Sequence, residues 1–371
     1  MRFQVERDAL ADAVAWTART LPSRPPVPIL AGLLLGVAGT GLTLSAFDYE
    51  VSAEAELELA EGEDGQALVS GRLLAEICRS LPGTVVEMAA EGSRMSLHCG
   101  SARFLLPLLP VEEYPTLPQM PTASGTIGSD AFAAAVTSVA VAAGRDDTLP
   151  VLTGVRIEID GENLMLVATD RYRLAVRELP WQPQAPGITA TALVPARTLA
   201  ETARALTSGA EVTMALAGTG SAEGMVGFAG GRRRTTTRLL DGEFPKYESL
   251  LPTEFAATTL MATATLVEAV KRVSLVAARN TPVRLSFSTD TLELEAGGAD
   301  EAQALERLET EYDGEPMTVA FNPGFLLDGL GAIDSDVARL AFTSPSRPAV
   351  ITGKDSGADY RYLLMPVRLS G

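Results

Sequence analysis

The segment LVATDRYRLAV, residues 166–176, places charged and aromatic side chains between two apolar triplets. Asp170, Arg171 and Arg173 could act together in three ways. The carboxylate could be catalytic, the arginines could contact the phosphates of a nucleic acid, or the group could bind another protein. Each of these chemistries needs further residues, so the rest of the sequence decides among them.

The residue types that an enzyme needs do not occur in a usable pattern. His98 is the only histidine, and it lies beside Cys99 with no second ligand pair for a metal. The arginine run GGRRRTTTR, residues 230–238, lacks the lysine of a phosphate loop. Cys78 and Cys99 lie in apolar patterns and are expected to be buried thiols. We therefore predict no enzyme activity, no catalytic residue, no bound metal and no cofactor.

Composition describes a folded, multidomain and strongly acidic chain. At 371 residues it exceeds what one hydrophobic core usually supports, which favours two or three domains. No uninterrupted apolar run reaches about 18 residues, so we expect no membrane-spanning helix. Residues 1–14 carry acids where a secretory signal needs an apolar block, which favours the cytoplasm. The net charge of −17 argues against a surface that coats nucleic acid indiscriminately.

One unit of the sequence occurs three times. Residues 27–50 align without gaps to residues 149–172, and residues 281–298 form a fainter third copy. Asp48 aligns with Asp170, an offset of 122 positions (170 − 48). Because Asp48 and Asp170 recur at equivalent places, a turn-capping role is favoured over catalysis for both.

Helical spacing of apolar residues recurs in the same order in each unit. The predicted helices cover residues 7–22 and 69–82, 129–144 and 194–209, and 263–279 and 321–333. Asp or Thr near the start of the first helix of each pair is expected to cap it. In the segment 69–82, Leu73, Ile77 and Leu81 are expected to share the buried face. Alternating segments between the helices predict antiparallel strands.

Proline-rich connectors separate the units. The segments EEYPTLPQMP, 112–121, and GEFPKYESLLP, 242–252, end the first and second copies. We predict three domains, at residues 1–122, 123–253 and 254–371. The fold class is α+β, with three tandem repeats of two helices packed on an antiparallel sheet.

Five features in collinear order resemble the bacterial β sliding clamp. They are the triplication, the Pro-Ile-Leu hairpin entry, ATDRYRLA, DGEFPKYESLLP and the C-terminal YRYLLMPVRL. The resemblance covers essentially the whole chain, and the preference for arginine over lysine looks like an actinobacterial member. It implies the DNA clamp fold, the processivity role in DNA polymerase III and a ring-forming homodimer that encircles duplex DNA without sequence specificity.

The resemblance also implies a set of protein partners that bind through short linear motifs. These are the polymerase III α subunit, the clamp loader, other polymerases, ligase and repair proteins, with no membrane partner. Two alternatives stay open. The chain could be a second-copy clamp that confers resistance to a groove-binding inhibitor, or a protein scaffold that does not bind DNA.

In the resembling family the helices line the central hole, so basic residues on or beside them are expected to contact phosphates. The expected DNA contacts are Arg24, Arg72, Arg79, Arg145, Arg197, Arg204, Lys271 and Arg272. Arg72 and Arg197 hold equivalent places in two repeats, which favours a shared role. Phosphate contacts carry no sequence information, so they permit sliding. Some family members have an aromatic pair where this chain has Pro150 and Val151.

Partner peptides of the family bind an apolar cleft between domains two and three. The matching positions are Leu152, Thr169, Arg171, Arg173, Leu174, Pro245, Leu250, Asn322, Phe325, Ser346, Arg347, Met365, Pro366, Val367, Arg368 and Leu369. The apolar members would form the walls, while arginine heads, Thr169 and Asn322 would hydrogen-bond to the peptide. Arg171 and Tyr172 replace a smaller or imidazole pair, so peptide preference is expected to differ.

Dimer contacts are expected in the first and the third domain. Phe104 and Leu106 of ARFLLPLLP match the domain-one edge, and Ser274 with Leu275 match the facing helix end. A head-to-tail contact closes into a ring when its rotation permits. Burial of Phe104 within its own domain explains the same pattern equally well.

Overall fold

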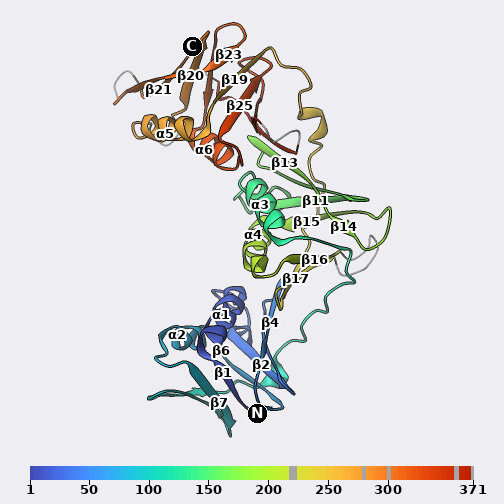
Figure 1. Cartoon of the computed structure of the whole chain (residues 1–371). Coiled ribbons are helices and arrows are strands. Elements are labelled where there is room, and N and C mark those ends of the chain that lie inside the picture. The colour runs from blue at the N-terminus through green and yellow to red at the C-terminus, as the bar shows by residue number, and fades with distance from the viewer. Residues whose placement is uncertain (217–223, 278–280, 299–301, 355–358, 369–371) are drawn as a thin grey trace. The chain divides into compact units, whose positions relative to one another are not determined.

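A computed structural model describes most of the chain. The described residues are 1–216, 224–277, 281–298, 302–354 and 359–368. They fold into two compact units, which share the second repeat between them (Figure 1). Unit 1 holds residues 1–130, 182–185 and 201–239. Unit 2 holds residues 131–181, 186–200 and 240–371.

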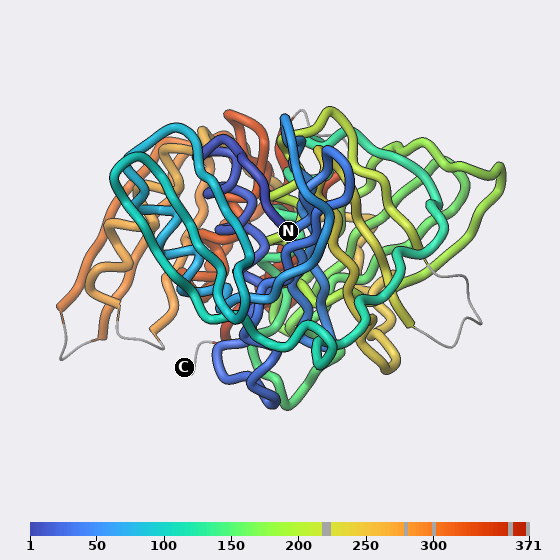
Figure 2. The backbone as a smooth tube through the Cα atoms, turned by 90° about the horizontal axis from the view of Figure 1, so that it is seen from below, coloured from blue at the N-terminus to red at the C-terminus, as the bar shows by residue number. Residues whose placement is uncertain are grey.

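Unit 1 contains two antiparallel sheets. In spatial order, the five-stranded sheet is β5 (Gly62–Glu63), β1 (Arg2–Glu6), β7 (Val85–Glu91), β8 (Arg94–Cys99) and β9 (Ala102–Pro107). The nine-stranded sheet is β14 (Gln182–Pro183), β10 (Gly125–Gly128), β16 (Glu211–Leu216), β17 (Met225–Gly230), β18 (Arg233–Arg238), β4 (Val51–Glu58), β3 (Gly41–Phe47), β2 (Gly32–Ala38) and β6 (Gly65–Ser70). The consecutive hairpins of β7, β8 and β9 run as adjacent lengths of the tube in Figure 2.

Two helices pack on strands of both sheets. Helix α1 (Arg7–Thr17) packs on β1, β3, β4 and on α2 (Gly71–Ser80), which also contacts β6. Leu10 and Leu74 are completely buried in the shared core, where each contributes about 1.5–3 kcal/mol. Of the three residues expected on the buried face, Ile77 and Leu81 are buried, whereas Leu73 is 42% exposed and that part of the prediction is wrong. The buried leucine is Leu74, in the same stripe as Ile77.

Unit 2 also contains two antiparallel sheets. The nine-stranded sheet is β15 (Thr189–Pro195), β11 (Gly154–Asp160), β12 (Asn163–Thr169), β13 (Arg173–Pro180), β27 (Tyr360–Leu364), β26 (Ala349–Gly353), β25 (Val337–Phe342), β19 (Ala257–Ala262) and β23 (Glu311–Asp313). The four-stranded sheet is β22 (Ala304–Glu309), β21 (Thr291–Ala296), β20 (Val283–Ser288) and β24 (Met317–Phe321). Helix α5 (Thr263–Ser274) packs on all the strands from β19 to β22 and on α6 (Pro323–Gly331).

The remaining helices, α3 (Ser129–Ala140) and α4 (Ala196–Ala205), belong to the second repeat. All six predicted helices are therefore present, each shorter than its sequence pattern. The predicted caps of α1 and α5 are wrong. Glu6 caps α1, since its carboxylate accepts from the Ala9 N–H at 2.7 Å. Ala262 holds the cap position of α5, and the Thr263 hydroxyl instead donates to the Ser335 carbonyl.

Sheets continue across the repeat boundaries. β18 pairs with β4, and β13 pairs with β27, each in antiparallel register. Strands β2, β3 and β4 match β11, β12 and β13 at the same offset of 122 positions found in the sequence. Each repeat therefore contributes strands to two sheets instead of standing on a single sheet of its own.

Candidate functional site

Asp170 closes the tight turn between β12 and β13. Its Oδ1 accepts from the backbone N–H groups of Tyr172 at 3.0 Å and Arg173 at 3.1 Å. Arg171, inside the turn, has a φ of 78°, a left-handed conformation that costs a non-glycine residue about 1–2 kcal/mol. The two hydrogen bonds to Asp170 hold the turn in this conformation.

The turn between β3 and β4 repeats this geometry. Asp48 Oδ1 accepts from the N–H groups of Glu50 at 2.9 Å and Val51 at 2.7 Å. Tyr49 has a φ of 76° at the position equivalent to Arg171. The turn-capping role predicted for both aspartates is therefore confirmed.

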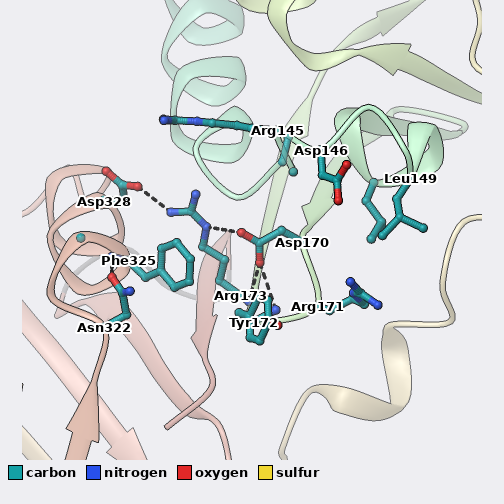
Figure 3. Close-up of a pocket in the computed structure, with 14 residues that line it drawn as sticks. Arg145, Asp146, Leu149, Asp170, Arg171, Tyr172, Arg173, Asn322, Phe325 and Asp328 are labelled. Carbon is teal, nitrogen blue, oxygen red and sulfur yellow. Dashed lines mark hydrogen bonds and ion pairs between the residues drawn. The ribbon is translucent and has the colours of Figure 1, made fainter. Parts of the chain in front are cut away.

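Arg173 is the residue that distinguishes the second turn from the first. Its side chain is buried, its Nε lies 2.9 Å from Asp170 Oδ2, and its Nη1 lies 2.5 Å from Asp328 Oδ2 (Figure 3). The guanidinium carbon lies 4.3 Å from the centre of the Phe325 ring. Nη1 also lies 3.5 Å from the Tyr362 hydroxyl. Arg173 therefore joins β13 to α6 and β27.

Electrostatics match this role of Arg173 as a buried cation. Burial alone would lower the pKa of its guanidinium, but the hydrogen bonds to Asp328 and Tyr362 and the charge of Asp170 raise it. Burial raises the pKa of Tyr362 to about 12, so this phenol donates its proton to the Phe325 carbonyl at 2.8 Å. The Nε and Nη1 groups of the guanidinium are therefore bound by groups of the chain itself.

An apolar cavity of about 230 Å³ lies on the sheet beside the Asp170 turn. Its lining is Thr169, Arg171, Arg173, Leu174, Pro245, Tyr247, Leu250, Leu363 and Met365. We call it the leucine pocket. Tyr247 and Leu363 line this pocket but were not among the pocket residues expected from the sequence. Leu363 could have been found from strand alternation, since it lies two positions before Met365 and faces Leu174 across the β13–β27 pair.

A larger cavity of about 800 Å³ adjoins it through Arg171 and Arg173, which line both (Figure 3). Its lining is Ala143, Gly144, Arg145, Asp146, Leu149, Leu152, Asp170, Arg171, Tyr172, Arg173, Asn322, Gly324, Phe325 and Asp328. The ring centres of Tyr172 and Phe325 lie 6.3 Å apart. Arg145, predicted as a DNA contact, lies in this lining. The leucine pocket and the larger cavity together form what we call the candidate groove.

Two polar residues of the groove already have hydrogen-bond partners in the chain. The Thr169 hydroxyl donates to the Arg173 carbonyl at 2.7 Å and accepts from the Arg171 N–H at 3.2 Å. Asn322 caps α6, because its Oδ1 accepts from the Phe325 N–H at 3.1 Å. These two oxygens therefore stabilise the groove walls.

The C-terminal segment is anchored beside the groove. The Met365 N–H donates to the Tyr172 carbonyl at 2.8 Å, and the Val367 N–H donates to the Ala320 carbonyl at 2.8 Å. Pro366, Val367, Arg368, Ser346 and Arg347 line neither cavity. Leu369 lies outside the described residues.

Two of the helices present equivalent basic faces. On α2, Arg72, Glu76 and Arg79 are exposed, while Leu74, Ile77 and Cys78 turn toward the core. On α4, the exposed residues Arg197, Glu201 and Arg204 follow at an offset of 125 positions (197 − 72). The Arg72 Nη2 donates to the Pro22 carbonyl at 3.0 Å, which places it beside the exposed segment that carries Arg24.

The basic residues of α5 are engaged with acids. Lys271 Nζ lies 2.9 Å from Glu268 Oε1, and Arg272 Nη2 lies 2.6 Å from Glu306 Oε1. All four side chains lie at the surface, so solvent screens these pairs and leaves the cations accessible.

The predicted dimer residues differ in exposure. Leu106 is 1% exposed and belongs to the core of unit 1. Its neighbour Leu105 points outward and is 49% exposed. Phe104 is partly buried against the same core. Leu275, at the end of α5, is 85% exposed, and the Ser274 hydroxyl donates to the Val270 carbonyl.

The described residues show no cluster of three or more His, Cys, Asp or Glu side chains that could hold a metal ion. Nor is any helix in the described part of the chain long and apolar enough to cross a membrane. The fold and the groove define a tandem-repeat protein with a partly apolar surface groove in unit 2.

Comparison with known proteins gives the family. The N-terminal, central and C-terminal domains of the DNA polymerase III beta subunit match residues 1–118, 126–246 and 248–368 in turn. The chain is 60% identical to the beta sliding clamp of Streptomyces coelicolor, with both chains covered completely. It is 48% identical to that of Micrococcus luteus, over 82% of this chain and 98% of the relative. The chain therefore belongs to the beta sliding clamp family.

A solved structure carries the same fold. The sliding clamp of Pseudomonas aeruginosa bound to griselimycin superposes with a TM-score of 0.92 at 29% identity, and both chains are covered completely. The predicted fold class of three tandem α+β units and the resemblance to the clamp family are both confirmed.

Proposed function

We propose that this chain is a DNA-sliding processivity subunit in the cytoplasm. Two copies form a ring around duplex DNA and tether the replicative polymerase and other partners through the groove beside Arg173. The chain itself catalyses no reaction. The predicted domain limits, 1–122, 123–253 and 254–371, fit this plan, because each then supplies two helices and strands for two sheets.

The observation that carries the proposal is a pair of uncovered edge strands that each expose a leucine. β9 and β22 are outer strands of their sheets, and no described strand covers their outer edges. Each exposes a leucine, Leu105 at 49% and Leu305 at 58%. An uncovered apolar edge invites aggregation unless another chain pairs with it. Head-to-tail pairing of β9 with β22 of a second copy would cover both edges and close a ring.

The exposed arginines of α2 and α4 support a DNA-facing role for the helices. Both helices repeat an Arg, Glu, Arg pattern on their outward faces, although the chain carries a net charge of −17. Glutamates between the arginines moderate attraction to phosphates. Weak contacts of this kind favour sliding, because enclosure and not affinity holds the ring on DNA.

The groove supports the tethering role. The leucine pocket offers apolar walls from Leu174, Leu250 and Leu363, and Met365 at its rim adapts to different side chains. Its volume of about 230 Å³ suits one or two apolar side chains of a linear peptide.

Retention on DNA tests the proposal. After treatment with a clamp loader and ATP, the protein should stay on nicked circular DNA through a high-salt wash and should escape once a restriction enzyme linearises that DNA. Salt removes electrostatic binding but not enclosure. Equal retention on circular and linear DNA would contradict a sliding ring.

A further inference from the structure

A second cavity lies on the same sheet face as the leucine pocket and shares no residue with the groove. Its volume is about 330 Å³, and we call it the basic pocket. It is lined by Leu251, Pro252, Phe255, Arg339, Val350, Thr352, Gly353, Lys354 and Arg361. Three of these residues are cations and none is an acid.

Strand register brings the basic residues together. Arg339 of β25 pairs with Thr352 of β26, and the pairing of Ile351 with Tyr362 places Arg361 of β27 opposite Thr352 on the other side. Directly paired residues point to the same face of a sheet. With strands about 4.8 Å apart, the two arginine Cα atoms lie roughly 10 Å apart, within the reach of two guanidinium groups on one anion.

These cations are only partly neutralised. Arg361 Nη2 lies 2.5 Å from Glu178 Oε1. Arg339 lies over the Phe255 ring at 5.3 Å, and neither Arg339 nor Lys354 forms an ion pair within the described residues. The Thr352 hydroxyl makes no hydrogen bond in that part of the chain either. A guanidinium over an apolar wall is weakly hydrated and therefore well suited to an oxyanion.

The basic pocket continues the leucine pocket along the sheet. Leu174 pairs with Leu363 in one cross-strand row, and Val176 pairs with Arg361 two positions further along. Residues two apart on a strand lie about 6.6–6.8 Å from each other. The connector spans both pockets, since Leu250 lines the leucine pocket and Leu251 lines the basic pocket.

We propose that the two pockets form one extended seat for a partner peptide. An apolar side chain enters the leucine pocket, and an acidic residue of the same peptide enters the basic pocket, where Arg339, Lys354 and the Thr352 hydroxyl bind its carboxylate. The proposal rests on the peptide-binding function of the groove. It adds a chemical requirement, because the net charge of −17 repels an acidic segment overall, whereas the basic pocket attracts it.

The test uses a fluorescent, uncharged peptide in which leucine and phenylalanine alternate with serine, and two derivatives with three glutamates at one end or the other. One derivative should bind the wild type about fivefold more tightly than the uncharged peptide, the gain from exposed ion pairs. In the Arg339→Ala/Lys354→Ala variant that gain should vanish, while the affinity for the uncharged peptide stays unchanged and reports correct folding.

The matched control is Arg234→Ala/Arg284→Ala, which removes the same charge from exposed positions on β18 and β20. It should keep the gain. A gain that persists without Arg339 and Lys354, or that is absent from the wild type, overturns the proposal.

The outcomes for the two proposals differ. If the uncharged peptide does not bind but a glutamate derivative binds through Arg339 and Lys354, the groove assignment fails and the basic pocket stands. If no peptide binds, both fail. If inorganic phosphate protects Lys354 from acylation while glutamates give no gain, the pocket takes a small anion and the peptide assignment is overturned.

Discussion

Arg173 organises the groove at the level of single residues. Its guanidinium bonds Asp170 in its own turn, reaches Asp328 on α6 and lies against Phe325. A buried arginine is tolerated only when carboxylates neutralise it and hydrogen bonds satisfy it. Because both conditions are met, the groove walls are fixed before any peptide arrives, which lowers the entropic cost of binding.

Replacing Asp328 with asparagine should loosen this network. The neutral amide still accepts a hydrogen bond but no longer offsets the buried charge. The half-exposed position limits the expected loss to about 1 kcal/mol in the free energy of unfolding. Urea titration measures it, with Asp334→Asn as the matched control on the exposed loop after α6. Equal stability of the two variants would show that Asp328 does not hold Arg173 in place.

Tyr362 predicts how stability depends on pH. Its raised pKa, to about 12, means that the folded protein holds the phenol neutral after the unfolded chain has begun to ionise near pH 10. Tyr362 therefore makes its full contribution to the free energy of unfolding below pH 10. This contribution is lost as the pH rises toward 12, by about 1.4 kcal/mol per pH unit.

Unfolding free energies of the wild type and Tyr362→Phe between pH 8 and about 12 check this sign. The variant is less stable at pH 8, because the Phe325 carbonyl loses its donor. Its stability should fall less steeply with pH, so the two curves converge. Parallel curves would show that Tyr362 does not titrate with folding.

The sequence predicted the turn residues well and the side-chain directions less well. Asp48 and Asp170 were predictable because a turn cap depends on its near neighbours alone. Leu106 was not, since ARFLLPLLP has leucines at both alternating positions of the strand and either set could face the core. The hydrogen bonds of Thr169 and Asn322 join residues at most four positions apart, so they too depend on near neighbours and could have been predicted.

At the level of elements, β9 separates stability from assembly. Leu105 and Leu106 are neighbours on one strand but point to opposite faces. Leu106→Ala should remove buried contacts in unit 1 and cost about 2–5 kcal/mol of unfolding free energy. Leu105→Asp should leave the fold intact and instead place a charge on the edge proposed to pair with β22.

Analytical ultracentrifugation and chemical unfolding distinguish the two variants. Leu105→Asp is expected to sediment as a monomer, whereas Leu106→Ala should dimerise at temperatures where it remains folded. A fully dimeric Leu105→Asp would remove β9 from the proposed interface.

Elements were predictable where the signal is local. The hairpins β2–β3 and β11–β12 followed from the repeat, and six helices followed from apolar spacing. The pairings of β18 with β4 and of β13 with β27 join strands about 180 positions apart in sequence. No local pattern encodes such pairings, because they depend on how whole repeats pack. The leucine and basic pockets both lie on the sheet made by the second pairing, so their contiguity was likewise invisible in the sequence.

At the scale of the whole molecule, the basic residues are grouped at particular surfaces of an acidic chain. The chain is acidic overall, with exposed arginines at repeated helix positions and three cations gathered in the basic pocket. An acidic surface repels DNA that lies outside the ring, while the arginines contact the duplex that the ring encloses. Apart from Arg145, which lines the groove, the expected DNA contacts share no residue with the two cavities of the groove, so the proposed ring can bind DNA and a partner together.

Covalent closure of the ring tests this account most directly. Leu105→Cys and Leu305→Cys in one chain would place thiols on both proposed edges, where a bismaleimide can link two copies. The native cysteines should not compete, since both are buried and burial, with the nearby Cys99, raises the pKa of the Cys78 thiol to about 12. After loading on nicked circular DNA, the linked dimer should stay with the circle in denaturing detergent and separate when the DNA is cut. Linked protein that leaves intact circles in detergent, or stays equally on linear DNA, would contradict encirclement.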